Sequence, residues 1–137
     1  VTICRFYNVY GDYMPTEGEY RTVLPIFLEQ YRKGETITVT GDGEQRRDFT
    51  HVNDIVDAMM KVVQLNKWGS VFELGRGENC SINELADMFY DGHNVTYIDS
   101  IPGEVRETLC RSELARKKLK WNPKINVKEW LWEKICK

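Results

Sequence analysis

The side chains best suited to binding an anion follow a predicted turn. Asp42 and Gly43 indicate a tight hairpin turn, because both residue types tolerate a positive φ. Arg46 and Arg47 come next, with Asp48 directly beside them. A guanidinium braced by a carboxylate presents a planar fork of N–H donors that matches a phosphate group. The stretch is suited to a phosphate-binding arginine, but a surface Arg–Asp ion pair is the commoner role of such residues, and the local sequence leaves both open.

A second candidate lies where the first predicted strand ends. Residues 1–7 are apolar apart from Thr2 and Arg5, a pattern typical of a buried strand in the middle of a parallel sheet. Asn8 and Gly11 end this strand, and the carboxyl edge of an open α/β sheet is where ligands bind. The Asn8 amide is therefore suited to a phosphate or a sugar hydroxyl, while a turn-forming asparagine is the alternative.

Helices and short strands must position these side chains. Hydrophobic spacing predicts helices near residues 24–33, 55–65, 82–89, 112–119 and 127–135, and strands at residues 36–40, 70–74 and 95–98. Asn53 or Asp54 is expected to cap the second helix, and Ser81 begins a capping box. Phe49 and Val52 are expected to be buried. This alternation of elements predicts an α/β fold.

The length and composition are those of one globular domain or a piece of one. The 137 residues are 42% hydrophobic and 29% charged, with a net charge of -2. We expect a cytoplasmic protein, since no apolar run approaches a membrane span and the first residues do not resemble a signal peptide. The four cysteines are far apart, which favours reduced, mostly buried thiols and no metal site. No basic stripe with interleaved aromatic residues indicates nucleic-acid binding.

The sequence predicts no catalytic centre within this chain. Residues 41–46 and 75–80 come near to a dinucleotide-binding glycine motif, but both stretches lack the third glycine. No tyrosine is followed four residues later by lysine, and the nucleophile and phosphate-loop motifs are missing as well. We therefore expect neither catalytic nor cofactor-binding residues here.

Several motifs, in their order along the chain, resemble those of a known family. They are Arg5-Phe6-Tyr7-Asn8-Val9-Tyr10-Gly11, Gly41-Asp42-Gly43, Arg47-Asp48-Phe49, Leu74-Gly75-x-Gly77-Glu78-Asn79 and Pro102-Gly103-Glu104. Together they resemble the nucleotide-sugar epimerases and dehydratases, which are extended short-chain dehydrogenase/reductases. In that family an N-terminal Rossmann domain binds NAD(P), and the C-terminal part binds the nucleotide diphosphate of the substrate.

The resemblance implies that residues 1–137 are the C-terminal substrate-binding portion, with the NAD(P)-binding N-terminal domain outside this chain. The expected fold is one or more late Rossmann strands plus a small mixed α/β domain. The implied function of the intact protein is an NAD(P)-dependent UDP-sugar 4-epimerase. A 4,6-dehydratase or decarboxylase of the same family, and a non-catalytic nucleotide-sugar binding module, are the alternatives. Exposed apolar surface on this portion would favour association, including a homo-oligomer.

The resemblance also implies the residues that contact the substrate. Asn8 would contact the diphosphate or the sugar, Arg47 would clasp the diphosphate, and Glu104 would lie near the ribose hydroxyls. Leu24 and Pro25 would lie beside the nucleotide.

The resemblance concerns three further positions, one beside the nucleotide base and two where this chain departs from the family. Val39 would lie against the base. Many relatives have a second diphosphate-binding arginine where this chain has Ile101, and Arg106 is the candidate substitute.

Overall fold

The computed structural model describes residues 1–19 and 21–136. This part of the chain forms two compact units, each assembled from three separate stretches. Unit 1 contains Val1–Gly11, Arg47–Asn79 and Thr108–Val127, and unit 2 contains Asp12–Arg46, Cys80–Glu107 and Lys128–Lys137. The two units are therefore interleaved along the sequence.

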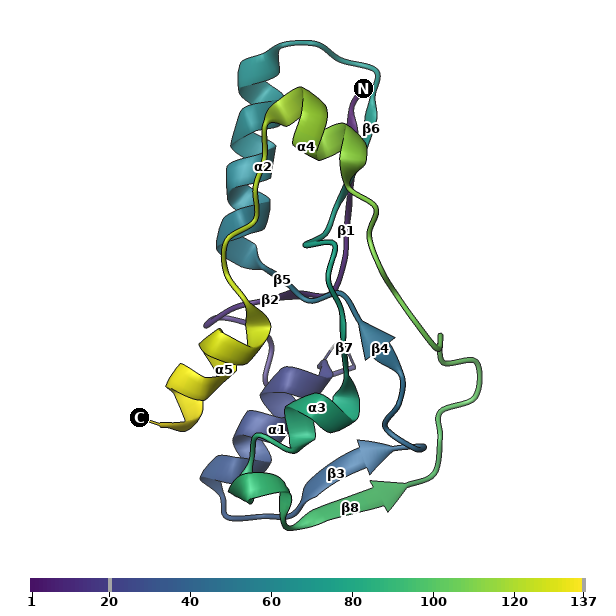
Figure 1. The fold of residues 1–137 in the computed structure, drawn as a ribbon, viewed down its shortest axis with the longest axis vertical. Coiled ribbons are helices and arrows are strands. Elements are labelled where there is room, and N and C mark those ends of the chain that lie inside the picture. Colours follow the sequence, from purple (N-terminus) through teal and green to yellow (C-terminus); the bar gives the residue numbers. More distant parts are fainter. Residues whose placement is uncertain (20, 137) are drawn as a thin grey trace. The chain divides into compact units, whose positions relative to one another are not determined.

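Unit 1 is built on parallel strands and two helices. Its elements are β1 (Ile3–Phe6), β2 (Val9–Tyr10), β5 (Thr50–His51), α2 (Val52–Leu65), β6 (Val71–Leu74) and α4 (Glu113–Leu119). β1 runs parallel to β6, with Ile3 opposite Val71, and the two strands lie side by side in Figure 1. β2 runs parallel to β5. The parallel pairing confirms the predicted α/β class at the level of architecture.

The core of unit 1 lies where α2 and α4 pack against β6. Its buried members are Ile55, Ala58, Val62, Phe72, Leu74, Ala115, Leu119 and Trp121. The α2 residues among them recur at helical spacing, so one face of that helix is buried. Trp121 satisfies its indole N–H by donating to the backbone carbonyl of Asp54 over 2.8 Å.

The start of α2 differs from the sequence prediction. The helix begins at Val52, and the imidazole Nδ1 of His51 accepts the N–H of Asn53 as the cap. The predicted cap Asp54 is instead buried, and its carboxylate accepts the backbone N–H groups of Lys124 and Ile125 at 3.1 and 3.0 Å. Val52, predicted to be buried, is 37% exposed, whereas Phe49 is buried as predicted.

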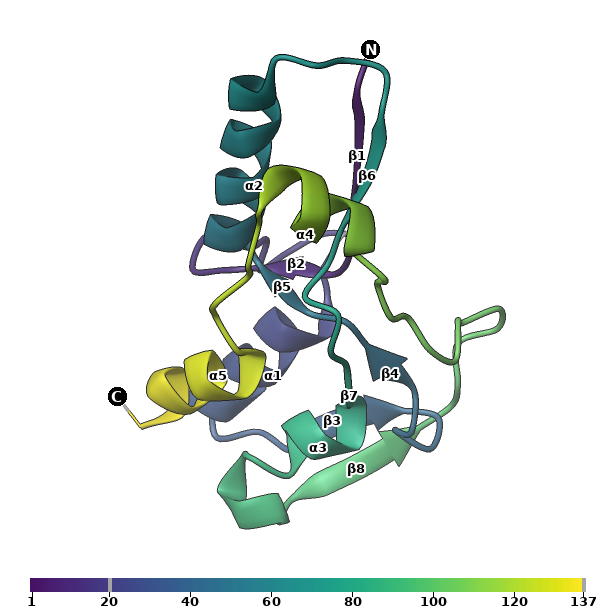
Figure 2. The ribbon, with the colours of Figure 1, turned by 45° about the horizontal axis from the view of Figure 1, so that its top comes forward.

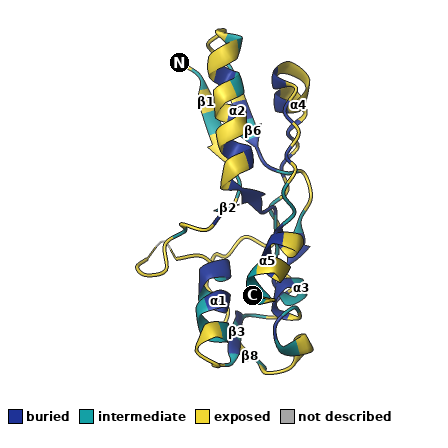
Figure 3. Ribbon diagram, turned by 90° about the vertical axis from the view of Figure 1, so that its left-hand side faces the viewer, coloured by how far each residue is buried: buried dark blue, intermediate teal, exposed yellow. Residues whose placement is uncertain are grey.

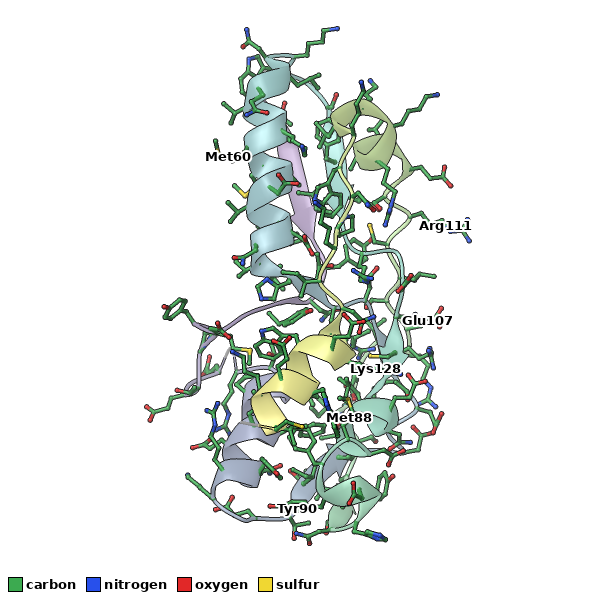
Figure 4. All side chains as sticks on the ribbon, turned by 60° about the vertical axis from the view of Figure 1, so that its left-hand side comes forward. Met60, Met88, Tyr90, Glu107, Arg111 and Lys128 are labelled. Atoms are coloured by element: carbon green, nitrogen blue, oxygen red, sulfur yellow. The ribbon has the colours of Figure 1, made fainter. Side chains whose placement is uncertain are left out.

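Exposed apolar side chains cover parts of β1 and α2. β1 was predicted to be buried on both faces, but Ile3 and Phe6 are 46% and 49% exposed. On α2 the exposed apolar set is Val52, Val56, Met59, Met60 and Val63. Figure 3 shows this exposed stripe along α2, and Figure 4 shows Met60 pointing away from the ribbons of β1 and β6. Within the described chain β1 has one strand partner and these two side chains are uncovered, so the predicted burial on both faces is not found there.

Unit 2 packs helices against a second parallel strand pair. Its elements are α1 (Val23–Arg32), β3 (Ile37–Thr40), β7 (Cys80–Ser81), α3 (Ile82–Ala86), a 3-10 helix (Tyr90–Gly92), β8 (Val95–Ile98) and, beginning at the end of unit 1, α5 (Val127–Ile135). β3 and β8 are parallel and adjacent, as Figure 2 shows. Phe27 and Phe89 pack edge to face in the core, with ring centroids 5.8 Å apart.

The turn after β3 does not form the predicted hairpin. β3 pairs with β8, while β4 (Arg46–Arg47) belongs to a different sheet. Gly41 and Gly43 do adopt positive φ values of 65° and 75°. A side chain at Gly43 would also collide with Asn83, whose backbone N–H donates to the Gly43 carbonyl over 2.9 Å. The two glycines therefore redirect the chain between sheets.

Within residues 1–19 and 21–136, no helix is both long enough and apolar enough to cross a bilayer. The same residues bring no three His, Cys, Asp or Glu side chains into an arrangement that suits a metal ion.

Candidate functional site

The carboxylate of Asp48 is the centre of a hydrogen-bond cluster in unit 1. Its side chain is fully buried, at 0% exposure. Oδ1 accepts the backbone N–H of Arg76 at 3.0 Å, and Oδ2 accepts those of Gly77 and Cys110, both at 2.9 Å. The Thr50 hydroxyl donates to Oδ1 at 3.4 Å. A buried carboxylate is thus balanced by oriented amides, and it joins the loop after β6 to the segment before α4.

The glycine after β6 permits this close approach. A Cβ at Gly75 would lie 2.3 Å from Cβ of Cys110 and 3.1 Å from Oδ2 of Asp48. The first distance is shorter than any two unbonded carbons tolerate, so the segment before α4 reaches Asp48 only because residue 75 has no side chain. The first glycine of the Leu74-Gly75-x-Gly77 motif is therefore required because a side chain at this position would collide with Cys110.

The Asn8 carboxamide is tied to the same cluster through Thr108. Asn8 is exposed and has a φ of 29°, an uncommon backbone conformation that asparagine tolerates. The Thr108 hydroxyl donates to Asn8 Oδ1 over 3.1 Å and accepts the backbone N–H of Asp48 over 3.1 Å. The Thr108 carbonyl accepts Nδ2 of Asn79 at 3.1 Å. The end of β1 is therefore held in a defined geometry by residues distant in sequence.

Two other ionisable groups near the cluster stay protonated at neutral pH. Burial raises the pKa of the Cys110 thiol to about 11, and the neighbouring carboxylate of Asp48 adds to this effect. Burial, followed by the charge of Glu73, raises the pKa of the Tyr7 phenol. Tyr7 donates its hydroxyl to Glu73 over 3.3 Å. Neither group is a ready base or nucleophile, so the cluster is better suited to hydrogen bonding than to proton transfer.

In unit 2 the turn after β3 carries a two-pronged ion pair. Both oxygens of Asp42 accept N–H bonds from the Arg106 guanidinium, each over 2.8 Å. The Arg106 hydrogen bonds, followed by the backbone N–H of Glu44, lower the pKa of Asp42 to about 2. Both side chains are exposed, so the ion pair contributes little to the free energy of folding and mainly orients the two segments that it joins. It fixes the segment after β8 to this turn.

The sequence-predicted substrate residues divide between the units. Asn8 and Arg47 belong to unit 1. Leu24, Pro25, Val39, Glu104 and Arg106 belong to unit 2. Arg47 is half-buried and Glu104 is exposed. Arg106 lies on Asp42 in this structure, and its role at a diphosphate stays a prediction.

The three apolar positions are inside the packing of unit 2. Leu24 and Val39 are both 0% exposed, and Pro25 is buried on the same helix as Leu24. In this structure their side chains support the surrounding backbone. Contact with a nucleotide at these three positions stays a prediction.

Thr108 and the amide-binding role of Asp48 were missed by the sequence analysis. The sequence predicts Asp48 as a partner for arginine, whereas its carboxylate binds amides 28, 29 and 62 residues away and the Thr50 hydroxyl. One signal was available, because Asp48 directly precedes Phe49, which is predicted to be buried. A charged residue there needs internal partners. No pattern in the sequence around Thr108 indicates its hydrogen bonds to Asn8 and Asp48.

Comparison with known proteins places these motifs in context. A family model described as "NAD dependent epimerase/dehydratase family" matches residues 1–75. A protein of Methanocaldococcus jannaschii, provisionally named a UDP-glucose 4-epimerase, is 34% identical over 132 residues, which are 93% of this chain and 42% of that protein. The UDP-N-acetyl-alpha-D-glucosaminuronate decarboxylase of Bacillus cytotoxicus is 35% identical over 100 residues, 73% of this chain and 30% of that protein.

A solved structure shares the fold. The crystal structure of UDP-glucose 4-epimerase from Thermotoga maritima with UDP-glucose superimposes with a TM-score of 0.87 at 31% identity. The match covers 98% of this chain and 44% of that one. The chain thus spans less than half the length of these three similar proteins.

Proposed function

This chain belongs to the NAD dependent epimerase/dehydratase family, and we propose that it forms the nucleotide-sugar-binding part of an NAD(P)-dependent UDP-sugar 4-epimerase. Residues 1–137 correspond in this proposal to the C-terminal substrate-binding portion. NAD(P) and the groups that carry out hydride and proton transfer belong to a preceding Rossmann domain.

The arrangement of Asn8 supports this proposal more than any other single observation. Asn8 lies two residues after the end of β1, and its carboxamide is oriented by Thr108, which is itself held by the backbone of Asp48. Arg47 precedes Asp48 in the chain and contributes a positive charge to the same unit. An amide and a guanidinium are the groups expected for binding the charged diphosphate of an activated sugar.

The chemistry near the cluster also favours binding over catalysis by this chain. The thiol of Cys110 has a pKa of about 11, and the pKa of Tyr7 is raised by burial. Both remain neutral near pH 7, so neither is prepared to remove a proton from a sugar hydroxyl. The exposed apolar stripe of α2 is, in this proposal, the surface on which further α/β structure packs.

The test is the affinity of the full-length gene product for UDP-glucose, measured by isothermal titration calorimetry. Arg47→Ala removes a charge-assisted contact, so we expect an affinity at least about tenfold weaker. Arg111→Ala is the matched control, because Arg111 is an exposed arginine of unit 1 that projects from the segment before α4 (Figure 4). Unchanged affinity in Arg47→Ala would contradict the assigned role.

The product formed by the full-length protein separates the alternatives. Conversion of UDP-glucose into its 4-epimer by the full-length product with NAD(P) supports the epimerase. Loss of a carboxyl group from a UDP-uronic acid, or formation of a 4-keto-6-deoxy sugar, would point to the decarboxylase or the dehydratase. Binding of UDP-glucose without conversion of any of these substrates would favour the non-catalytic module.

A further inference from the structure

The Thr108 hydroxyl has two assigned hydrogen bonds, and together they determine how the Asn8 amide is oriented. A hydroxyl group carries one proton and can accept further bonds on oxygen. In this structure the Thr108 oxygen accepts the backbone N–H of Asp48 at 3.1 Å. Its proton then finds an acceptor in Asn8 Oδ1, also at 3.1 Å. The opposite orientation of the amide would leave this proton without an acceptor among these partners.

The consequence is that Asn8 offers donors to a ligand. With Oδ1 on Thr108, the amide nitrogen carries two N–H groups that bind no other residue of the described chain, residues 1–19 and 21–136. Asn8 is exposed, so these donors are accessible to small molecules. Oxygen atoms that only accept hydrogen bonds, as in a phosphate, are the matching chemistry.

We propose that Thr108 is a positioning residue for substrate binding, which holds the Asn8 amide with its N–H groups directed to a diphosphate oxygen. This proposal rests on the proposed function and extends it to a residue with no predicted role. Thr108 acts through Asn8, and its own position is set by the Asp48 backbone. A purely structural role for Thr108 predicts a loss of stability without any dependence on Asn8.

The first experiment measures UDP affinity of the full-length gene product by calorimetry. Thr108→Val removes the hydroxyl at nearly constant shape, and we expect binding weaker by about threefold or more, the effect of one neutral hydrogen bond. Thr108→Ser keeps the hydroxyl and should restore wild-type affinity. In an Asn8→Ala background, Thr108→Val should cause no further loss. An equal loss in that background, or no loss in the single variant, would overturn the proposal.

A matched control exists in unit 2. The Thr36 hydroxyl donates to Oδ1 of Asn94 over 2.9 Å, which is the same type of pair at another exposed position. Thr36→Val should leave UDP affinity unchanged. A loss as large as that of Thr108→Val would show that removing any such hydroxyl weakens binding indirectly, and this would also overturn the proposal.

Asn8→Asp tests the direction of the amide. The variant keeps an oxygen for the Thr108 hydroxyl but replaces the donating nitrogen with a second, negatively charged oxygen. We expect UDP binding at least about tenfold weaker, because like charges then face each other. Affinity within about twofold of wild type would mean that Asn8 accepts from the ligand, and the proposal would fail.

A second readout separates failure of this inference from failure of the proposed function. The order parameter of the Asn8 side-chain amide in the ligand-free protein is measured by ¹⁵N relaxation. We expect a value of about 0.85 in the wild type, a value below about 0.6 in Thr108→Val, and the wild-type value again in Thr108→Ser. If the wild-type protein binds no UDP, the proposed function fails, while this measurement alone still decides whether Thr108 holds Asn8. A mobile wild-type amide would refute the positioning role.

Discussion

Replacing Asp48 should have the largest effect on stability of the changes considered for this protein. In Asp48→Ala, the N–H groups of Gly77 and Cys110 lose their acceptor, whereas the N–H of Arg76 keeps a second one, Oγ1 of Thr50 at 3.0 Å. An orphaned buried donor costs about 1–3 kcal/mol, and Gly77 is exposed enough to gain some solvation. We therefore expect unfolding free energy to fall by about 2–5 kcal/mol.

Asp48→Asn is the finer perturbation. The shape is preserved and one oxygen remains, so two of the amide bonds can persist without the help of the negative charge. The expected loss is about 1–3 kcal/mol, which lies between wild type and Asp48→Ala. Such losses are a substantial fraction of the roughly 5–15 kcal/mol that stabilises a typical domain.

The assay is equilibrium urea unfolding of the purified protein, followed by circular dichroism, with the slope of free energy against urea as a check on comparable unfolding. The control is Asp57→Asn on α2, where the carboxylate is 54% exposed and pairs only loosely with Lys61 at 3.9 Å. This change should cost less than about 0.5 kcal/mol. If Asp48→Ala costs no more than the control, the amide-binding role inferred for Asp48 is refuted.

Two further predictions concern ionisable side chains. We expect NMR titration to give the Asp42 carboxyl a pKa of about 2. The stabilisation from its pair with Arg106 is then fully present above pH 3.8 and is lost as the pH falls toward about 2. Arg106→Gln should return the Asp42 pKa toward 3.8, and an ordinary Asp42 pKa in the unchanged protein would disprove the pairing in solution. In the folded protein at pH 8, a thiol-specific disulfide reagent should modify the exposed Cys136 rapidly and the buried Cys80 and Cys110 far more slowly. Burial blocks access to both thiols, and it raises the pKa of Cys110 to about 11. Equal modification rates, measured by peptide mass spectrometry, would contradict this prediction.

Features set by nearby residues were predictable from the sequence. The capping box is present, since the Ser81 hydroxyl accepts the Glu84 N–H and the Glu84 carboxylate accepts the Ser81 N–H. The strand predicted at residues 95–98 has those limits in the structure. Gly34 has a φ of 70° just after α1, as expected for a glycine that ends a helix. For the capping box and Gly34 the determining atoms lie within a few residues, and for the strand the alternating pattern is local although its partner, β3, is distant.

Features set by distant residues were not predictable. The local sequence predicts Asn53 or Asp54 as a helix cap, but the segment after Trp121 provides amides that bind the Asp54 carboxylate, and His51 is the cap. The hairpin prediction from Asp42 and Gly43 failed for a related reason, because β3 pairs with a strand more than fifty residues later. Tertiary partners here outweigh local preference. Part of the candidate site, the pair of Asn8 and Thr108, joins residues 100 positions apart.

The interleaving of the two units has a consequence for synthesis on the ribosome. Unit 1 needs its last stretch, Thr108–Val127, before Asp48 can meet the amide of Cys110, and unit 2 needs Lys128–Lys137 as well. Neither unit can reach its final contacts while the chain is only half translated. The face of α2 that carries Ile55, Ala58 and Val62 therefore stays uncovered on the nascent chain until Ala115, Leu119 and Trp121 have emerged, and it is a binding site for chaperones that shield apolar surfaces during that interval.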